Sequence, residues 1–304
     1  MKLPNAFLLI LFFLTPTLKA NSAIPLVLNS ALYSIEKSDK TDVLEVLALR
    51  SPRVFFLSSH NEEAVVTARV ALATHSWVAL HINEQNYEVL KITLLDRPTP
   101  QEKQSGSSRW NPTLYSPSLV SSFNQATSLF DAVDSYTDSD LSDNCYNRAH
   151  YWARTFDLNY KIKSMKVFVL FTPAYRKEHN FNWWYHVAPF VNVTTSEGQS
   201  RVVLDPSYEQ SPLDIRKWVF HFASKADHCR VAQYLHEFKD TSALGGCVVI
   251  TASMYHYIPQ DLDLVNPPVN WRCDDLKAVE SALRAPAPYS DWKKYTDFLP
   301  DYCR

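Results

Sequence analysis

The chain has 304 residues, and its 30 Lys and Arg residues nearly balance its 32 Asp and Glu residues. This balance, without a long run of one sign, argues against nucleic acid or an anionic membrane as the main partner. Only four glycines are present, so the sequence has neither a glycine-rich phosphate loop nor the nucleophile elbow of serine hydrolases. Nucleotide chemistry is therefore disfavoured.

Residues 1–20 have the pattern of a secretory signal peptide. Lys2 precedes an apolar run from Ala6 to Leu14, and a small residue follows at Ala20. The run is too short for a membrane anchor, and no later window is long and apolar enough to cross a bilayer. We therefore predict cleavage near Ala20 and a secreted or periplasmic protein with no membrane anchor.

The rest of the chain, residues 21–304, is longer than one hydrophobic core usually serves, which suggests two domains. Residues 21–97 hold two β-rich runs around an apolar run compatible with helix or strand, so we predict an α+β N-terminal domain or pro-region. Residues 98–118 are rich in Pro and Ser, as in an exposed linker that proteases cut. Residues 119–304 then form the candidate catalytic domain.

The second domain is predicted to mix helices and strands. Its expected strands cover residues 165–172, 183–193, 200–206 and 247–258. Its expected helices cover residues 119–136, 144–157, 212–222, 225–238 and 273–284.

Five cysteines are an odd number for an exported protein. Cys145 stands alone, whereas Cys229, Cys247, Cys273 and Cys303 fall in the last quarter of the chain. We predict two disulfides among these four and a free thiol at Cys145. Three pairings are possible, of which 229 with 247 and 273 with 303 is preferred. No two of these cysteines have the close spacing of zinc knuckles, so a zinc site is disfavoured. We expect neither a metal nor a cofactor.

Cys145 follows the helix-capping residues 142–144 and opens a segment with helical periodicity. At the first turn of a helix, unpaired backbone N–H groups and the helix dipole both favour thiolate. The apolar stripe of Cys145, Ala149, Trp152 and Phe156 turns the sulfur toward the interior. A buried cysteine more often packs as a small hydrophobic residue than acts as a nucleophile. A catalytic role for Cys145 therefore requires partner residues.

His186 and Asp205 are the candidate partners. His186 lies in a strand with two apolar faces, where Trp184 is expected on its side, so the imidazole needs a polar partner. Asp205 closes the following strand just before Pro206. Core packing and turn formation explain each residue singly. Together with Cys145 they have the layout of papain-like and transglutaminase-like thiol enzymes.

Each member of this set has a distinct expected role. Cys145 attacks a carbonyl carbon, His186 transfers protons, and Asp205 orients the imidazole. The backbone N–H of Cys145 is a candidate oxyanion donor, and the sequence leaves the second donor open. The candidate walls of a substrate slot, for which ordinary strand packing is the alternative, are the aromatic residues Trp183, Trp184 and Tyr185.

The segments DNCYNRAH, WYHVAPFV and VVLDPS resemble the secreted bacterial protein-glutamine glutaminases, or protein glutamine deamidases, in order and in spacing. The resemblance covers about residues 140–215. It implies a transglutaminase-like α+β core, a triad of Cys145, His186 and Asp205, and hydrolysis of glutamine side-chain amides in proteins or peptides through a Cys thioester, with release of ammonia. It also implies an N-terminal pro-region that blocks the active site, for which residues 21–110 are the candidate.

Three alternatives stay open. A transglutaminase resolves the same thioester with an amine instead of water, a thiol peptidase uses the same triad, and a disulfide-stabilised exported binding protein needs no chemistry. Under the deamidase hypothesis the partners are glutamine-bearing proteins or peptides, and we expect a monomer.

Overall fold

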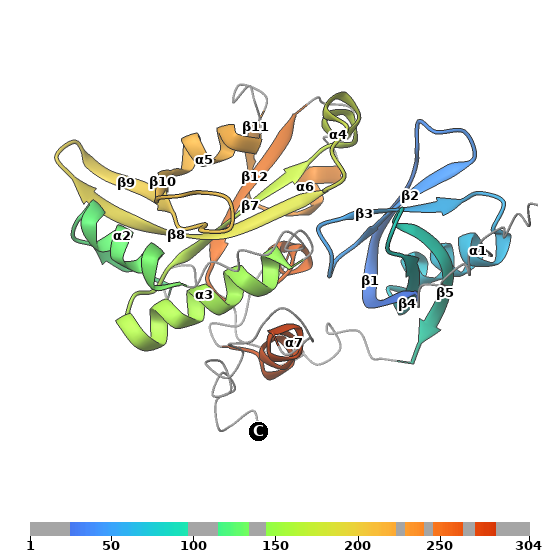
Figure 1. The fold of residues 1–304 in the computed structure, drawn as a ribbon, viewed down its shortest axis with the longest axis horizontal. Coiled ribbons are helices and arrows are strands. Elements are labelled where there is room, and N and C mark those ends of the chain that lie inside the picture. Colours follow the sequence, from blue (N-terminus) through green and yellow to red (C-terminus); the bar gives the residue numbers. More distant parts are fainter. Residues whose placement is uncertain are drawn as a thin grey trace, which may run out of the picture.

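A computed structural model of the chain describes residues 25–96, 115–133, 144–222, 229–239, 246–263 and 271–283. The expected signal peptide, most of the expected linker, and Cys303 lie outside these residues. The described chain forms two bodies, a barrel at the N-terminal side and a larger body built around a sheet (Figure 1). No helix within these ranges is long and apolar enough to cross a membrane.

The N-terminal body is a closed barrel with the strand order β1-β2-β3-β5-β4 and one helix. The apolar run that was compatible with helix or strand contains both, because His75 adopts a left-handed conformation (φ 54°) that ends the helix before the next strand. Val46, Leu80 and Ile82 are fully buried in the barrel core. The elements are β1 (Leu26–Lys37), β2 (Val43–Ala48), β3 (Val54–Ser58), α1 (Glu62–Thr74), β4 (Trp77–Asn83) and β5 (Glu88–Leu95).

The larger body contains a seven-stranded sheet of order β10-β9-β8-β7-β12-β11, with β6 paired to β8. The pairs β11–β12 and β6–β8 are parallel, and the other pairs are antiparallel. The strands are β6 (Leu119–Val120), β7 (Met165–Phe171), β8 (Tyr185–Thr195), β9 (Gly198–Val203), β10 (Leu213–Asp214), β11 (Cys229–Ala232) and β12 (Cys247–Ser253).

Helices cover both faces of this sheet, with α2 and α3 on one face and α5 on the other (Figure 1). In β7, Phe168 and Leu170 pack on the α3 side, whereas Val167 and Val169 pack on the α5 side. Successive side chains of a strand alternate between faces, so burial of both sets makes β7 a central strand. The helices are α2 (Phe123–Ala132), α3 (Cys145–Tyr160), α4 (Pro173–His179), α5 (Ile215–Phe222), α6 (His236–Lys239), the 3₁₀ turn η5 (Pro259–Asp263) and α7 (Cys273–Leu283).

Several sequence expectations about elements are wrong. The short strands β6 and β10 occupy Leu119–Val120 and Leu213–Asp214, where helices were expected to begin. Residues 229–232 are strand β11 rather than part of a helix over 225–238, because pairing with β12 outweighs the local helical pattern. The exposed linker does not extend to 118, because Tyr115 is buried and its hydroxyl donates to the carbonyl oxygen of Ser164. Helix α4 was not anticipated, although Thr172 as its N-cap and Pro173 at its first position are readable start signals.

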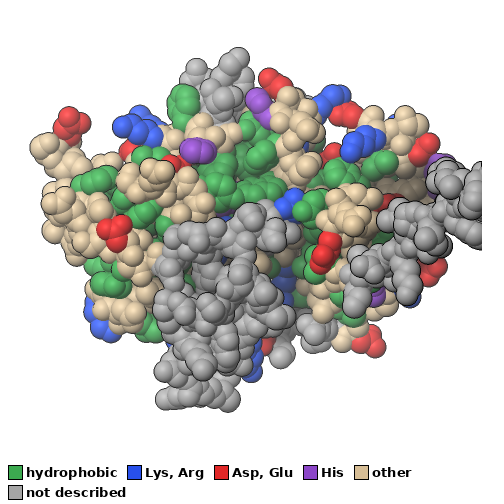
Figure 2. Space-filling view, in the orientation of Figure 1, with side chains coloured by type: hydrophobic (Ala, Val, Ile, Leu, Met, Phe, Trp, Pro, Cys, Tyr) green, Lys and Arg blue, Asp and Glu red, His purple; other side chains and the backbone are tan. Residues whose placement is uncertain are grey.

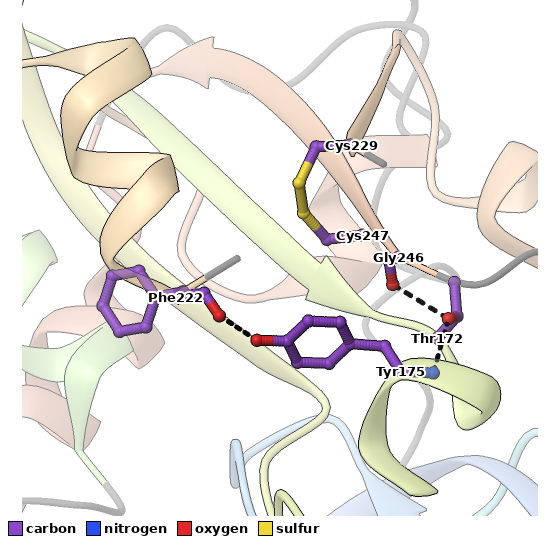
Figure 3. Close-up of a disulfide and its surroundings, with 6 residues drawn as sticks. All are labelled: Thr172, Tyr175, Phe222, Cys229, Gly246 and Cys247. Carbon is purple, nitrogen blue, oxygen red and sulfur yellow. Dashed lines mark hydrogen bonds between the residues drawn. A yellow bond between two sulfur atoms is a disulfide. The ribbon is translucent and has the colours of Figure 1, made fainter. Parts of the chain in front are cut away.

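The edge strand β11 is fastened by a disulfide between Cys229 and Cys247, which face each other across the β11–β12 ladder (Figure 3). Next to it, the carbonyl oxygen of Gly246 accepts a hydrogen bond from Thr172 Oγ1 at 2.8 Å. Thr172 is the N-cap of α4, and the hydroxyl of Tyr175 in α4 donates to the carbonyl oxygen of Phe222. The first expected disulfide is therefore present; Cys273 is also disulfide-bonded, and its expected partner Cys303 lies outside the described residues.

Removal of this disulfide is expected to destabilise the protein. The bridge closes a loop with a sequence separation of 18 residues, and restricting a loop of that length in the unfolded chain contributes about 3 kcal/mol. We expect the double substitution Cys229→Ala and Cys247→Ala to lower the free energy of unfolding by about 2–3 kcal/mol in denaturant titrations. Val231→Ala, at a site on β11 that is 77% exposed, should change it by less than about 0.5 kcal/mol; equal effects would show that the crosslink contributes little.

Positive and negative side chains are interspersed on the face of the molecule shown in Figure 2, with no large area of one sign. This arrangement agrees with the near balance of charges in the sequence. Within the described ranges, no group of three or more His, Cys, Asp or Glu side chains is placed to hold a metal ion.

Candidate active site

The thiol of Cys145 lies at the start of α3, as the sequence predicts. Asn144 is the N-cap residue, although its side chain makes no capping hydrogen bond to the helix. Cys145 is 1% exposed, and its sulfur faces the backbone N–H groups of Tyr146 and Val187. Because Val187 follows His186 on β8, the sulfur lies beside the strand position that carries the histidine.

His186 and Asp205 form a buried pair. The His186 Nε2 atom lies 2.8 Å from Asp205 Oδ2, and each side chain is 1% exposed. The Trp218 indole N–H donates to the same carboxylate oxygen at 3.0 Å. His186 Nδ1 is buried and has no hydrogen-bond partner among the described residues. Since Nε2 is engaged by the acid, Nδ1 is the atom left to exchange a proton with a thiol.

Four aromatic rings surround the imidazole of His186. The ring centroids of Tyr208 and Phe222 lie 4.7 and 4.9 Å from it, and those of Trp218 and Trp183 lie 5.5 and 5.7 Å from it. These contacts fix the plane of the imidazole and keep water from it. Sequence reasoning missed Tyr208, Trp218 and Phe222; the aromatic residues that follow Asp205 at short spacing were the available signal.

The three candidate slot residues occupy different places. Trp183 stacks on His186, at an interplanar angle of 29°. The expectation that Trp184 shares the side of His186 is wrong, because β8 begins only at Tyr185 and strand alternation does not apply before it. Trp184 and Tyr185 instead pack in the hydrophobic cluster that contains Cys145.

The connection between β2 and β3 of the barrel lies directly on these two aromatic residues. The Trp184 indole N–H donates to the carbonyl oxygens of Ser51 at 2.8 Å and Ala48 at 3.3 Å. The Tyr185 hydroxyl donates to the carbonyl oxygen of Leu49 at 3.3 Å. Leu49 also shares a hydrophobic cluster with Cys145, so the barrel shields this side of the site from solvent.

Burial decides the charge of the thiol in this closed arrangement. It raises the pKa of Cys145 to about 12, against the opposing effects of the Arg148 guanidinium and the Val187 N–H. It also lowers the pKa of His186, although Asp205 acts in the opposite direction. The expectation of a favoured thiolate is therefore wrong for the covered site, where thiol and imidazole are both uncharged at neutral pH.

Comparisons with known proteins find a family match and similar solved structures. Residues 121–222 match the model of a family described as glutaminase. A crystal structure of pro-protein-glutaminase superposes with a TM-score of 0.52 at 14% identity, covering 88% of this chain and 96% of that one. A mutant of pro-protein-glutaminase gives a TM-score of 0.51 at 16% identity, covering 88% and 97%. Compared with curated protein sequences, the chain has no significant match.

The structural likeness confirms the α+β fold class, and it extends into the barrel as well as the sheet body, because 88% of this chain is covered. The family match spans α2, Cys145, His186 and Asp205. Residues 121–222 therefore match the glutaminase family model, and the chain has the fold of pro-protein-glutaminase.

Proposed function

We propose that the protein deamidates glutamine side chains of proteins or peptides, with Cys145 as nucleophile, His186 as proton carrier and Asp205 as the group that orients the imidazole. One observation carries the proposal: a buried His186–Asp205 pair at 2.8 Å, with Nδ1 left over, lies one strand position from the N–H that faces the Cys145 sulfur. This geometry lies within a glutaminase-family segment.

The proposed reaction has two steps. The sulfur of Cys145 attacks the amide carbon of glutamine while His186 Nδ1 takes the thiol proton and passes it to the nitrogen that leaves as ammonia. Water then attacks the thioester carbon and gives one proton to His186, which returns it to the sulfur. The products are glutamate, ammonia and the original thiol. The backbone N–H of Cys145 is a proposed donor to the oxyanion.

The barrel is the proposed pro-region. It covers Trp184 and Tyr185, which would become walls of the substrate slot beside Trp183 once the barrel moves away. Two solved structures of this fold are described as pro-protein-glutaminase. A secretory signal in residues 1–20 and a disulfide at Cys229 fit synthesis for the periplasm or the medium. Cleavage between residues 97 and 114 would then open the site to protein substrates.

Substitution of the nucleophile tests the proposal. A chain carrying a specific protease site between residues 97 and 114 is cleaved and incubated with a glutamine-containing peptide. We expect ammonia release with an intact peptide backbone, and we expect Cys145→Ala to reduce its rate by about 10³-fold or more, because no other group forms the thioester. Activity of Cys145→Ala near that of the parent, with an unchanged unfolding midpoint, would reject the assignment.

The same incubation separates the alternatives. Incorporation of an added amine into the peptide would indicate a transglutaminase, and backbone cleavage would indicate a thiol peptidase. An inert thiol and no product, after confirmed cleavage, would favour a non-catalytic binding protein. The triad itself does not select water over an amine, because either acceptor attacks the same thioester carbon.

A further inference from the structure

The barrel also meets the sheet body through charged side chains at α4. Arg176 Nη2 lies 2.8 Å from a carboxylate oxygen of Glu45 and 3.1 Å from one of Glu36. Next to it, Lys177 Nζ lies 2.7 Å from Asp39 Oδ1. The Arg176 side chain is only 3% exposed. We call Arg176 and Lys177 the α4 basic pair.

The guanidinium of Arg176 also forms a hydrogen bond within the sheet body. Its Nη1 donates to the carbonyl oxygen of Phe171 at 2.9 Å, and the Phe171 N–H donates to the carbonyl oxygen of Trp184 at 2.8 Å. Two hydrogen bonds thus connect Arg176, through Phe171, to Trp184, which lies two residues before His186 in the sequence.

Beside Trp184, the barrel contacts the sheet body through extended backbone. The Val54 N–H donates to the carbonyl oxygen of Asn182 at 2.8 Å, and the Trp184 N–H donates to that of Pro52 at 2.7 Å. These bonds form a short antiparallel bridge that places Arg53 opposite Trp183. Adding an extended segment to a partner's backbone in this way is a common mode of peptide binding. A protein substrate that replaces the barrel would bond to the same backbone groups of Asn182 and Trp184. It would also lie beside the α4 basic pair.

Departure of the barrel leaves Arg176 without its two carboxylates. The guanidinium keeps its bond to Phe171, so it stays in position, and its planar fork suits a carboxylate. Resting on the proposed function, we propose that the α4 basic pair binds acidic side chains of protein substrates, so that glutamines with acidic neighbours are the preferred targets.

Peptide binding to the cleaved, unseparated complex tests this docking site. The chain carries the protease site between residues 97 and 114 and Cys145→Ala, so that peptides are not consumed. Two peptides of equal length have one glutamine flanked by either Glu or Ser. Since both compete with the same barrel, the ratio of their apparent dissociation constants reports the charge preference. We expect the acidic peptide to bind about tenfold tighter, the range of one charge-assisted hydrogen bond.

Substitution of the basic pair identifies the residue responsible. Arg176→Gln should bring the ratio to within about twofold of unity, whereas the matched control Arg201→Gln, at an exposed site on β9, should keep it. High salt should reduce the preference in the parent protein, because screening weakens ionic contacts. If Arg176→Gln does not fold, Lys177→Gln, at a side chain that is 65% exposed, should reduce the preference, and the salt dependence of the parent tests its ionic origin.

Each outcome separates the docking site from the enzyme assignment. Equal affinity of the parent for both peptides overturns the docking proposal. Ammonia release without a charge preference also overturns it and leaves the glutaminase proposal standing. A charge preference that depends on Arg176, without ammonia release from the Cys145 enzyme, supports the docking site and overturns the proposed function.

Discussion

Cys145 in the intact chain is expected to react very slowly with iodoacetamide at pH 7, and opening of the site is expected to accelerate the reaction about a thousandfold. The reason is the thiolate population. Burial in the closed structure raises the pKa of Cys145 to about 12, whereas an exposed thiol has a pKa of about 8.5. Each unit of difference changes the thiolate fraction at neutral pH about tenfold.

The pH dependence has a definite sign. In the intact chain the alkylation rate should rise about tenfold per unit up to pH 10, because the pH stays below the thiol pKa of about 12 throughout. In the cleaved chain, after dilution to release the barrel, the rate should level off near the ordinary thiol pKa or below it. Among the described residues Cys145 is the free cysteine, so intact-mass analysis follows one site. Equal rates before and after cleavage would contradict a covered thiol.

Asp205→Asn is expected to lower the rate of ammonia release from the cleaved protein by about 10³- to 10⁴-fold. With Asp205, the proton of His186 stays on Nε2, which donates to Oδ2 at 2.8 Å and leaves a lone pair on Nδ1. An asparagine amide can donate to Nε2 and shift the ring proton to Nδ1. An imidazole in that tautomer cannot take the proton of the thiol, so the nucleophile stays uncharged.

Trp218→Phe is the matched control for this variant. It removes one hydrogen bond to the same carboxylate oxygen, 3.0 Å long, and keeps an aromatic ring beside His186. Loss of one such bond corresponds to about 1 kcal/mol, or roughly a fivefold lower rate. The loss of activity in each variant is measured as the initial rate of ammonia release relative to the parent protein. A loss for Asp205→Asn no larger than that for Trp218→Phe would show that Asp205 does not set the tautomer.

Local signals were sufficient to predict several parts of this protein. The helix that begins at Cys145 and the strand that carries His186 follow from capping residues and apolar periodicity, which act over a few residues. The pairing of His186 with Asp205 spans only 19 residues and joins β8 to a residue two positions after the end of the neighbouring strand β9. Such near contacts are within reach of sequence patterns because sequential strands tend to pair.

Other parts depend on contacts that no local pattern encodes. The hydrogen bond from Trp184 to the carbonyl oxygen of Ser51 joins residues 133 positions apart. The sequence therefore does not predict that the barrel covers this side of the site. The pKa of Cys145 was predicted in the wrong direction for the same reason, since the helix start is local and the burial is not. Strand β11 was mistaken for helix because its partner β12 decides its conformation.

Under the proposed function, the β2–β3 connection is the part of the barrel that would keep the enzyme inactive. It presents main-chain carbonyl oxygens to Trp184 and Tyr185 and holds no glutamine, the single glutamine of residues 25–96 being Gln85 in the exposed turn before β5. The part of the barrel that contacts this side of the site thus carries no side-chain amide to hydrolyse. Under the proposed function, the barrel therefore offers the enzyme no substrate at this contact, and because a deamidase does not cut peptide bonds, release of the barrel requires another protease.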